Sequence, residues 1–303
     1  MQKLLLILTC LAIVSCKHDY DDLIENKNSI TDIEYISQEG VTYYTGSLGC
    51  AANGSYFYKS DKVLEDLVVP TNLPDNIDLS VFLPPVGDQG KQGSCISWAT
   101  TYYLKSFQER IQSGLLYDES RIMSPAYTYN QIVQGACGGT IFESTLDVLK
   151  SKGAASLQSF PYSDLNCFTQ PSLIQNEEAA FNKISDYKYL SGQNMVLEMK
   201  TLLTQETPIL ISVFLTKKFG ETDDLGLTSY REHVVDFTDG GCHGMLVVGY
   251  SDTKNAFKVV NSWGENWGNN GGFVWIDYAA FHNVADNTAS FRVISTAIIA
   301  YDL

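Results

Sequence analysis

A cysteine at the start of a predicted helix is the side chain of this sequence best placed for nucleophilic chemistry. The run QGKQGSCISWA occupies residues 89–99, and its glycines let the backbone turn tightly before Cys95. Apolar residues then recur at helical spacing as far as Ile111, and Gly114 is a suitable stop. The positive end of a helix favours a thiolate. Cys95 is therefore a candidate nucleophile, with a small buried core cysteine as the alternative.

A nucleophilic thiol needs a base and a donor that stabilises the oxyanion. Gln89 lies on the turn that leads to Cys95 and offers a side-chain N–H group, although a glutamine there is also compatible with a solvated loop. The base must come from the four histidines, which are His18, His233, His243 and His282. We favour His243 because it lies in a second informative run.

That second run predicts a β-hairpin. Residues 240–250 read GGCHGMLVVGY, and residues 256–264 read AFKVVNSWG after a short polar break. An antiparallel hairpin brings the start of its first strand beside the end of its second, so we expect His243 next to Asn261. An amide there fixes the tautomer and orientation of an imidazole, as a cysteine–histidine pair requires. Taken singly, a strand-end histidine and a turn-capping asparagine are the alternatives.

Together these runs resemble the active-site segments of papain-like cysteine peptidases. The turn and helix around Cys95 resemble the nucleophile segment, and NSWGENWGNNGGF (residues 261–273) resembles the family's Asn-Ser-Trp-Gly segment. The order Gln, Cys, His, Asn also agrees, with about 150 residues between cysteine and histidine. The resemblance spans residues 73–303. It implies a nucleophile, a general base and acid, an orienting amide and an oxyanion donor, which are Cys95, His243, Asn261 and Gln89.

The resemblance also implies substrate contacts. Gly138 and Gly139 match a pair of glycines that presents its backbone to an extended substrate, and only glycine permits so close an approach. A helix C-terminal turn is the alternative for this pair. Trp263 is implied to shield the histidine–asparagine hydrogen bond and to border the substrate. Two departures, the displaced Trp98 and Gln92 in place of a disulfide cysteine, leave the reacting groups intact and indicate a divergent bacterial branch.

The elements that must position these residues are mainly helices first and strands later. We predict helices over residues 95–113, 124–134, 140–152 and 194–205, the third opened by a Thr140–Glu143 capping box. Beyond the hairpin, we predict strands over residues 42–44, 56–58, 209–214, 273–276 and 291–301. This order indicates an α+β chain. The resemblance implies a papain-like two-lobe fold, with a helical lobe, an antiparallel β-barrel-like lobe and the active cleft between them.

The sequence has seven cysteines, and their use depends on export. Cys10 leaves with a signal peptide, Cys16 takes a lipid and Cys95 must stay free, so the remaining four are Cys50, Cys137, Cys167 and Cys242. Four cysteines allow three connectivities in an oxidising compartment. The family resemblance favours Cys137–Cys167, and Cys242 is also compatible with a small packing residue. A zinc site at Cys242 and His243 lacks a second ligand pair, so we expect no metal or cofactor.

The N-terminus resembles a bacterial lipoprotein signal. Residues 1–15 combine Lys3 with a short apolar run, which predicts a signal peptide too short to span a bilayer. Residues 13–16 read IVSC and resemble a lipobox, whose cysteine is acylated. An ordinary signal peptide with an incidental cysteine is the alternative. The acidic run after Cys16 resembles a surface-export signal, so we expect a lipid anchor at the outer membrane of a bacterial cell envelope.

Residues 16–72 form an acidic tether and pre-catalytic segment before a catalytic domain at residues 73–303. The segment is compatible with a short pro-piece, an accessory strand pair or a stalk. The chain has 303 residues, 45% of them hydrophobic, and a formal net charge of -15, which disfavours a nucleic-acid partner. We expect a monomer.

The predicted function is thiol-dependent hydrolysis of peptide bonds in exported proteins or peptides. We expect His243 to take the Cys95 proton before substrate arrives, so that the pair is an ion pair at rest. Acyl transfer to an amine, as in a transpeptidase or amidase, is one alternative. A catalytically silent surface-binding module is another, but it would not need all four site residues. A transglutaminase-like enzyme fits the NSWG run poorly.

Overall fold

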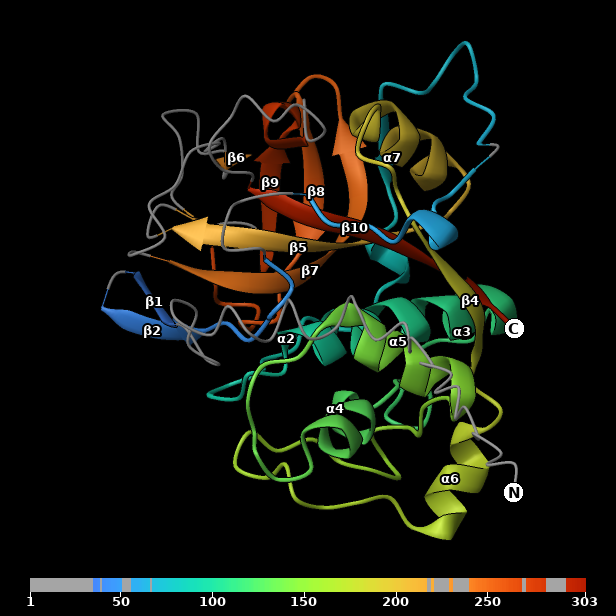
Figure 1. Cartoon of the computed structure of the whole chain (residues 1–303), viewed down its shortest axis with the longest axis vertical. Helices are drawn as coiled ribbons and strands as arrows, with labels where there is room; N and C mark the ends of the chain where they lie inside the picture. Colours follow the sequence, from blue (N-terminus) through green and yellow to red (C-terminus); the bar gives the residue numbers. More distant parts are fainter. Residues whose placement is uncertain are drawn as a thin grey trace, which may run out of the picture.

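The computed structural model describes residues 35–38, 40–50, 56–65, 67–216, 219–220, 229–230, 240–268, 271–281 and 293–303 (Figure 1). The predicted signal peptide, the lipid-bearing Cys16 and the acidic run after it lie outside these residues. Within them, helices gather on one side of the molecule and a large sheet on the other, as Figure 1 shows. The predicted α+β fold with two lobes is confirmed.

One continuous helical segment runs through the helical lobe. It comprises α2 (Cys95–Ser97), the π-helical η3 (Trp98–Lys105) and α3 (Ser106–Ser113), and it is buried from its start to Phe107. We call this segment the central helix. It ends at Gly114, whose φ of 67° is left-handed, as predicted for the stop residue. The other helices of this lobe are α4 (Pro125–Val133), α5 (Phe142–Ser151) and α6 (Leu173–Ala179).

The second lobe is an open, mainly antiparallel sheet. Its strand order is β4-β10-β5-β7-β8-β9-β6, and the short β3 pairs with β7. These strands are β3 (Asn76–Asp78), β4 (Ile184–Tyr189), β5 (Ile209–Thr216), β6 (Ser229–Tyr230), β7 (Gly240–Ser251), β8 (Ala256–Val260), β9 (Phe273–Asp277) and β10 (Ile294–Asp302). Among the described residues β4 and β6 do not pair with each other, so the expected barrel-like lobe is an open sheet rather than a closed barrel.

Shorter elements complete the described fold. Helix α7 (Met195–Thr204) is the helix predicted over residues 194–205, and it packs on β5 and β7. A separate two-stranded sheet consists of β1 (Tyr35–Gln38) and β2 (Val41–Tyr44). Single turns of 3₁₀ helix occur at η1 (Ser60–Lys62), η2 (Ser80–Phe82) and η5 (Tyr278–Phe281). Within the described residues no helix is long and apolar enough to cross a bilayer.

The predicted hairpin is present as β7 and β8. Leu246 pairs with Val260, and residues 252–255 form the turn. Strand β7 also pairs with β5, with His243 opposite Val213, so the hairpin is held inside the sheet rather than at its edge. At His243 the ladder partner is β5, and the pairing with β8 begins three residues later, at Leu246. The imidazole therefore projects from a strand that is anchored at His243 itself and again just beyond it.

Two local predictions were wrong. The Thr140–Glu143 capping box does not form, because Ile141 is the N-cap residue of α5 and makes no side-chain cap, while Glu143 accepts a hydrogen bond from Tyr189 Oη. A capping box forms instead at the start of α6, between Ser172 and Gln175. Residues 56–58 are not a strand.

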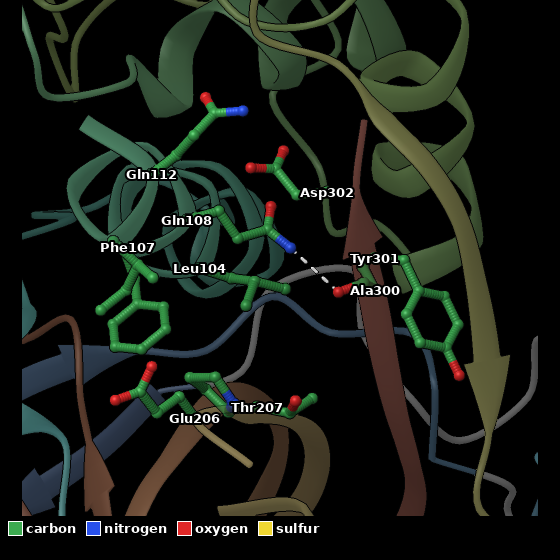
Figure 2. A pocket seen from close by; sticks show the side chains of 11 residues that line it. Leu104, Phe107, Gln108, Gln112, Glu206, Thr207, Ala300, Tyr301 and Asp302 are labelled. Atoms are coloured by element: carbon green, nitrogen blue, oxygen red, sulfur yellow. Dashed lines mark hydrogen bonds between the residues drawn. The ribbon is translucent and has the colours of Figure 1, made fainter.

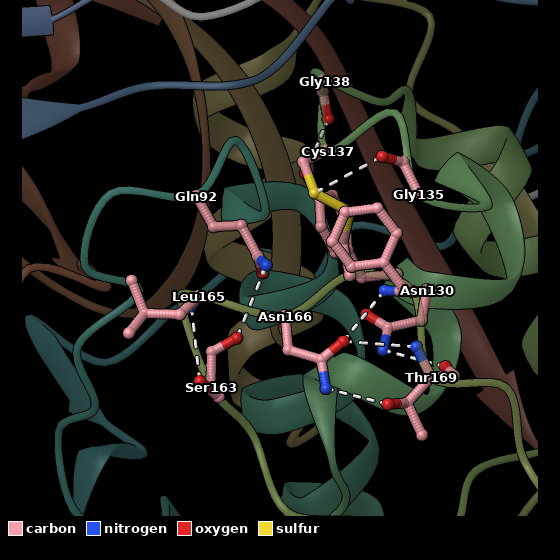
Figure 3. The surroundings of a disulfide bond; sticks show 12 residues. Gln92, Asn130, Gly135, Cys137, Gly138, Ser163, Leu165, Asn166 and Thr169 are labelled. Carbon is pink, nitrogen blue, oxygen red and sulfur yellow. Dashed lines mark hydrogen bonds between the residues drawn. A yellow bond between two sulfur atoms is a disulfide. The ribbon is translucent and has the colours of Figure 1, made fainter.

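Two disulfide bonds join the described cysteines. Cys137–Cys167 links the turn after α4 to the loop before α6, and it is the pair that the family resemblance favoured (Figure 3). Cys50–Cys242 links the pre-catalytic segment to β7, so Cys242 is not a small packing residue. Cys95 is the free cysteine of the described residues.

The two lobes are tied together at the far end of the central helix. Lys105 Nζ is buried and contacts both Glu109 Oε1, at 2.8 Å, and Asp302 on β10. Figure 2 shows the same seam, where Gln108 Nε2 donates to the Ala300 carbonyl at 2.9 Å beside a hollow of about 230 Å³. These contacts fix the central helix against the last residues of β10, and thereby help to orient the start of the helix at Cys95.

We predict that Asp302→Ala lowers the free energy of unfolding by about 1–3 kcal/mol, because it removes a charged partner from a buried ammonium group. Urea unfolding measures this change. The matched control is Asp186→Ala, which breaks an exposed pair with Lys150 and should cost about 0.5 kcal/mol. Equal losses in the two variants would show that the Lys105 contact does not hold the lobes.

Candidate active site

The N-terminus of the central helix meets β7 at the candidate nucleophile. The backbone N–H of Gly244 donates to Cys95 Sγ at 3.4 Å, and Gly244 follows His243 directly. A Cβ atom on Gly244 would lie 2.6 Å from Ile96 Cδ1, so the absence of a side chain lets helix and strand approach this closely. The structure therefore brings the predicted cysteine and histidine segments into contact.

His243 and Asn261 lie together as the hairpin predicted. His243 Nε2 lies 2.7 Å from Asn261 Oδ1, which can only accept, so Nε2 carries the proton. Nδ1 is then the basic nitrogen, and it is buried with no hydrogen-bond partner among the described residues. The Trp263 ring lies 4.7 Å from the imidazole ring and covers this pair. The other histidines, His18, His233 and His282, lie outside the described residues.

Two residues that sequence reasoning missed hold this arrangement. Tyr103, on the central helix, donates its hydroxyl to the Asn261 carbonyl at 2.8 Å and accepts from the Gly87 N–H at 3.0 Å. Its helical spacing indicated only an apolar core position. Ser262 donates Oγ–H to Gln89 Oε1 at 2.7 Å. Its place between Asn261 and Trp263 was the available signal, but a serine alone suggests no partner.

Gln89 is oriented so that its amide N–H groups are available as donors. Because Oε1 accepts from Ser262, Nε2 points the other way and donates to the Gln92 carbonyl at 2.8 Å and the Tyr44 carbonyl at 3.0 Å. The backbone of this turn is held as well, since Tyr162 Oη donates to the Gln89 carbonyl at 2.7 Å. A backbone carbonyl of the chain itself thus occupies the predicted oxyanion donor.

That carbonyl belongs to a segment that crosses the site, residues 41–50, which we call the strap. Figure 1 shows β2 and the chain after it at the junction of sheet and helices. The Tyr44 carbonyl also accepts from Trp263 Nε1 at 2.8 Å, and the Tyr43 ring stacks on the Trp263 ring at 4.9 Å. Gly46 follows, so close to Gly93 that a Cβ atom on it would lie 2.3 Å from the Gly93 Cα.

The second half of the strap pairs with both lobes. Thr140 N–H donates to the Gly46 carbonyl and Leu48 N–H donates to the Thr140 carbonyl, each at 2.9 Å. Ser47 N–H donates to the Cys242 carbonyl at 3.1 Å. The backbone that pairs with the extended strap is thus that of Thr140, the residue after Gly138 and Gly139. These pairings also occupy the Thr140 backbone, which explains why the N-cap of α5 is Ile141 and not the predicted Thr140.

Burial under the strap changes the ionisation of the site. Cys95, His243 and Gln89 are each 0% exposed. Desolvation raises the pKa of the Cys95 thiol to about 12, and desolvation lowers the pKa of His243 to about 4 against the opposing effect of the Asn261 hydrogen bond. The covered site therefore favours a neutral thiol and a neutral imidazole. The resting ion pair expected from the sequence is not favoured until water reaches the site.

The described residues contain no cluster of histidine, cysteine, aspartate and glutamate side chains that could hold a metal ion. The chemistry available to the site is that of a thiol, an imidazole and two amides. A thiol beside an imidazole of fixed tautomer, with a side-chain donor nearby, is an arrangement for acyl transfer through a thioester.

A model of the papain family of cysteine proteases matches residues 73–290 of this chain. Among curated proteins, the thiol protease SEN102 of Hemerocallis is 27% identical over 196 residues, which are 61% of this chain and 49% of that protein. Pro-cathepsin H of Bos taurus is 29% identical over 205 residues, which are 64% of this chain and 56% of that protein. The chain thus spans about half the length of these relatives.

Solved structures show the same fold. Xylellain, a cysteine protease from Xylella fastidiosa, superposes with a TM-score of 0.62 at 20% identity, over 83% of this chain and 97% of that one. Digestive procathepsin L 3 of Tenebrio molitor larval midgut superposes with a TM-score of 0.60 at 19% identity, over 82% of this chain and 76% of that one.

We predict that acid destabilises the covered site through His243. Its folded pKa of about 4 lies below the ordinary value of 6.5, so an unfolded chain binds a proton below pH 6.5 that the folded chain does not. Above pH 6.5 His243 is neutral in both states, and burying it carries no protonation penalty. As the pH falls from 6.5 toward 4, protonation stabilises the unfolded chain, and the free energy of unfolding falls. Between pH 7.5 and pH 4.5, wild type should lose about 2–3 kcal/mol more unfolding free energy than His243→Gln. Urea unfolding of both proteins at both pH values tests this, and parallel losses would contradict it.

Proposed function

Because this chain belongs to the papain family of cysteine proteases, we propose that it hydrolyses peptide bonds with Cys95, His243 and Asn261 as its catalytic triad. The observation that carries the proposal is the hydrogen bond between His243 Nε2 and Asn261 Oδ1. It leaves Nδ1 as the basic atom of an imidazole whose neighbouring residue contacts the Cys95 sulfur. A structural histidine would need no free basic nitrogen in a buried site.

In the proposed reaction, His243 Nδ1 takes the Cys95 proton once the strap has left and water has entered. The thiolate attacks a peptide carbonyl, and the Gln89 Nε2–H and the Cys95 backbone N–H bind the oxyanion. His243 then protonates the leaving amine. Water finally attacks the thioester, with His243 as base, and releases the acid.

The role of Gln89 is supported by what its side chain binds in the covered site. Its Nε2 donates to a peptide carbonyl oxygen, that of Tyr44, at 3.0 Å. A substrate carbonyl that replaced the strap would present the same kind of acceptor. The Ser262 hydroxyl keeps the amide from rotating, so the donor is preorganised rather than recruited.

We propose that the substrate is an extended protein or peptide chain. The strap supplies the precedent, because its backbone pairs with Thr140 and its Tyr43 ring stacks on Trp263. Gly138 and Gly139, just before Thr140, would border the same chain, and Trp263 would contact it on the other side of the nucleophile.

We further propose that residues 1–15 are a lipoprotein signal peptide and that Cys16 carries the lipid, which anchors a monomeric enzyme at the bacterial cell envelope. The lipobox-like run at residues 13–16 and the acidic run after it support this. Its substrates would then be exported proteins or peptides. The catalytic domain would begin at residue 73, where the family match also begins.

We predict that Cys95→Ala abolishes peptide cleavage and leaves the fold intact, because it removes the sulfur that accepts from the Gly244 N–H beside His243 and changes little else in the buried helix start. Cleavage of a mixed peptide library by the reduced full-length protein measures this. Running the reaction in ¹⁸O-water separates hydrolysis, which places one ¹⁸O in each new carboxylate, from acyl transfer to an amine. Cleavage by Cys95→Ala would remove the thiol from the mechanism.

We predict that Gln89→Ala lowers kcat by about 10²–10³-fold, the usual effect of removing one oxyanion donor. Gln92→Ala is the matched control, because Gln92 lies on the same turn and the described contact of its side chain is one long hydrogen bond to the Ser163 carbonyl, at 3.4 Å, while its backbone carbonyl, which accepts from Gln89, is kept in the variant. Its kcat should stay within about twofold of wild type. Similar losses in the two variants would mean that the turn, and not the Gln89 amide, matters.

We predict that Cys16→Ala abolishes incorporation of radiolabelled palmitate when the full chain is expressed in a bacterial host. The wild-type chain should be labelled and should fractionate with membranes. Equal labelling of both chains would place the lipid elsewhere, and no labelling of wild type would favour the ordinary signal peptide.

A further inference from the structure

We propose that the Cys50–Cys242 disulfide is a reducible latch: thiol–disulfide exchange with a dithiol reductant at this bond frees the strap and opens the active site. The proposal rests on the function proposed above, since it concerns access to the same cysteine. It adds a control of that site by a reaction at two cysteines that take no part in the peptide chemistry.

The position of the bond carries the argument. Cys242 precedes His243 directly on β7, and Cys50 is the last residue of the strap. The disulfide therefore fixes one end of the strap beside the imidazole. The two sulfurs are packed against Phe214, and Cys50 and Cys242 are 4% and 1% exposed. Just before this anchor, the Ser47 N–H donates a hydrogen bond to the Cys242 carbonyl. The disulfide and the backbone hydrogen bond therefore hold the same part of the strap.

The disulfide decides whether cutting the chain can free the strap. The chain after Cys50 is next held to the sheet at Phe57, whose N–H donates to the Ser295 carbonyl at 2.7 Å and whose carbonyl accepts from Thr296 Oγ1 at 2.8 Å. A protease cut between Cys50 and the catalytic domain would release an ordinary pro-piece. Here the severed strap would stay covalently attached to β7. Peptide-bond cleavage in this region is therefore not sufficient to open the site.

The closed disulfide also shortens the chain that connects the strap to the rest of the protein, so the strap is held more firmly at the site. A segment attached next to its binding site rebinds at a high effective concentration, and a longer attachment lowers that concentration. With the disulfide closed, the attachment point is Cys50 itself, two residues from the Leu48–Thr140 hydrogen bond. With it open, the nearest described attachment after Cys50 is at Tyr56, whose hydroxyl donates to the Leu190 carbonyl at 2.9 Å, so the strap is tethered through a longer stretch of chain and can leave the site.

The exchange step needs a dithiol as its second reactant. One reductant thiolate attacks a sulfur of the Cys50–Cys242 bond, forms a mixed disulfide and expels the other cysteine as a thiolate, which takes a proton. The second reductant thiol then displaces the remaining cysteine. The protein gains two electrons and two protons and ends with two thiols, and the reductant ends as a disulfide.

The second disulfide provides the matched control. Cys137–Cys167 joins two loops of the helical lobe, in the surroundings that Figure 3 shows, and neither of its cysteines belongs to the strap or to β7. Reducing it breaks a cross-link in the same protein without releasing Cys50. An effect that follows one bond and not the other separates a latch from general stabilisation.

The test is the rate at which iodoacetamide alkylates Cys95 in the full-length protein without reductant, followed by intact mass and peptide mapping. Cys50→Ala/Cys242→Ala should be alkylated at least about tenfold faster than wild type, because its strap is held only by noncovalent contacts. Cys137→Ala/Cys167→Ala should match wild type. Prior treatment with dithiothreitol, removed under anaerobic conditions before iodoacetamide is added, should raise the wild-type rate to that of Cys50→Ala/Cys242→Ala. Equal rates in wild type and Cys50→Ala/Cys242→Ala would overturn the proposal, as would equal acceleration by loss of either disulfide.

A measurement on wild type alone keeps the proposal open to refutation if a variant does not fold. Samples are taken during a time course in dithiothreitol, freed of it and pulsed briefly with iodoacetamide. Molecules alkylated at Cys95 should then be those in which Cys50 and Cys242 are reduced, as free or alkylated thiols. Alkylation of Cys95 at the same rate in molecules whose Cys50–Cys242 bond is intact would overturn the latch.

Peptide cleavage by the same samples distinguishes failure of the latch from failure of the proposed function. Reductant-dependent exposure of Cys95 without any peptide cleavage would refute the peptidase and leave the latch standing. Full peptide cleavage by protein whose Cys50–Cys242 bond is intact would refute the latch and leave the peptidase standing.

Discussion

The contact between Gly244 and the Cys95–Ile96 corner is the constraint on which the rest of the site depends. The sulfur comes from the helical lobe and the imidazole from the sheet, so their separation is set by how closely these two bodies approach. Gly244 leaves no room for a Cβ atom against Ile96. Its N–H reaches the Cys95 sulfur at 3.4 Å. A dense, well-packed interface transmits small shifts, so the seam at Lys105, at the other end of the central helix, also bears on this distance.

Polar contacts then define what each group can do at that distance. The Tyr103 hydroxyl, on the central helix, donates to the Asn261 carbonyl. The Asn261 side chain in turn accepts from His243 Nε2. Ser262 directs the Gln89 amide. Three consecutive residues follow β8, namely Asn261, Ser262 and Trp263. They orient His243, which we propose as the base, orient Gln89, which we propose as the oxyanion donor, and cover His243. A single short segment coordinates both halves of the proposed chemistry, which explains why the two lobes must close around it.

The sequence predicted the parts of this site that repeat or pair locally. Helical spacing located Cys95 at a helix start, and the two apolar runs around residues 251–255 located His243 beside Asn261, because a hairpin brings its strand ends together whatever surrounds it. Gln89 was a candidate from its place on the turn before Cys95, and the family resemblance implied its role, but its partner Ser262 lies far away in the chain and was not predicted. The role of Tyr103 could not be predicted from the sequence, because its helical spacing is the same as that of any buried core residue.

The strap could not be predicted in the same way. An extended segment that pairs with a loop has no period of its own, and residues 41–50 gave only a hint of a short strand. Four available cysteines permit three pairings, and spacing does not choose among them. The capping-box error has the same origin. Thr140 has the sequence of a helix start, but its backbone hydrogen bonds go to Gly46 and Leu48, and tertiary pairing overrode the local signal.

The burial of the site under the strap also keeps Cys95 and His243 in their neutral forms. The strap excludes water, and without water or a substrate to solvate charge, the thiol keeps its proton and the imidazole stays neutral. The same strap occupies the Gln89 donor and the Thr140 backbone that an extended substrate would use. Substrate binding and strap binding are then mutually exclusive, and apparent substrate affinity falls by the fraction of molecules whose site is closed. The Cys50–Cys242 bond anchors the strap next to His243 without contributing an atom to the proposed triad. In our proposal this anchor changes only the fraction of closed molecules, so a chain whose proposed site is fully assembled would stay inactive until the bond is reduced.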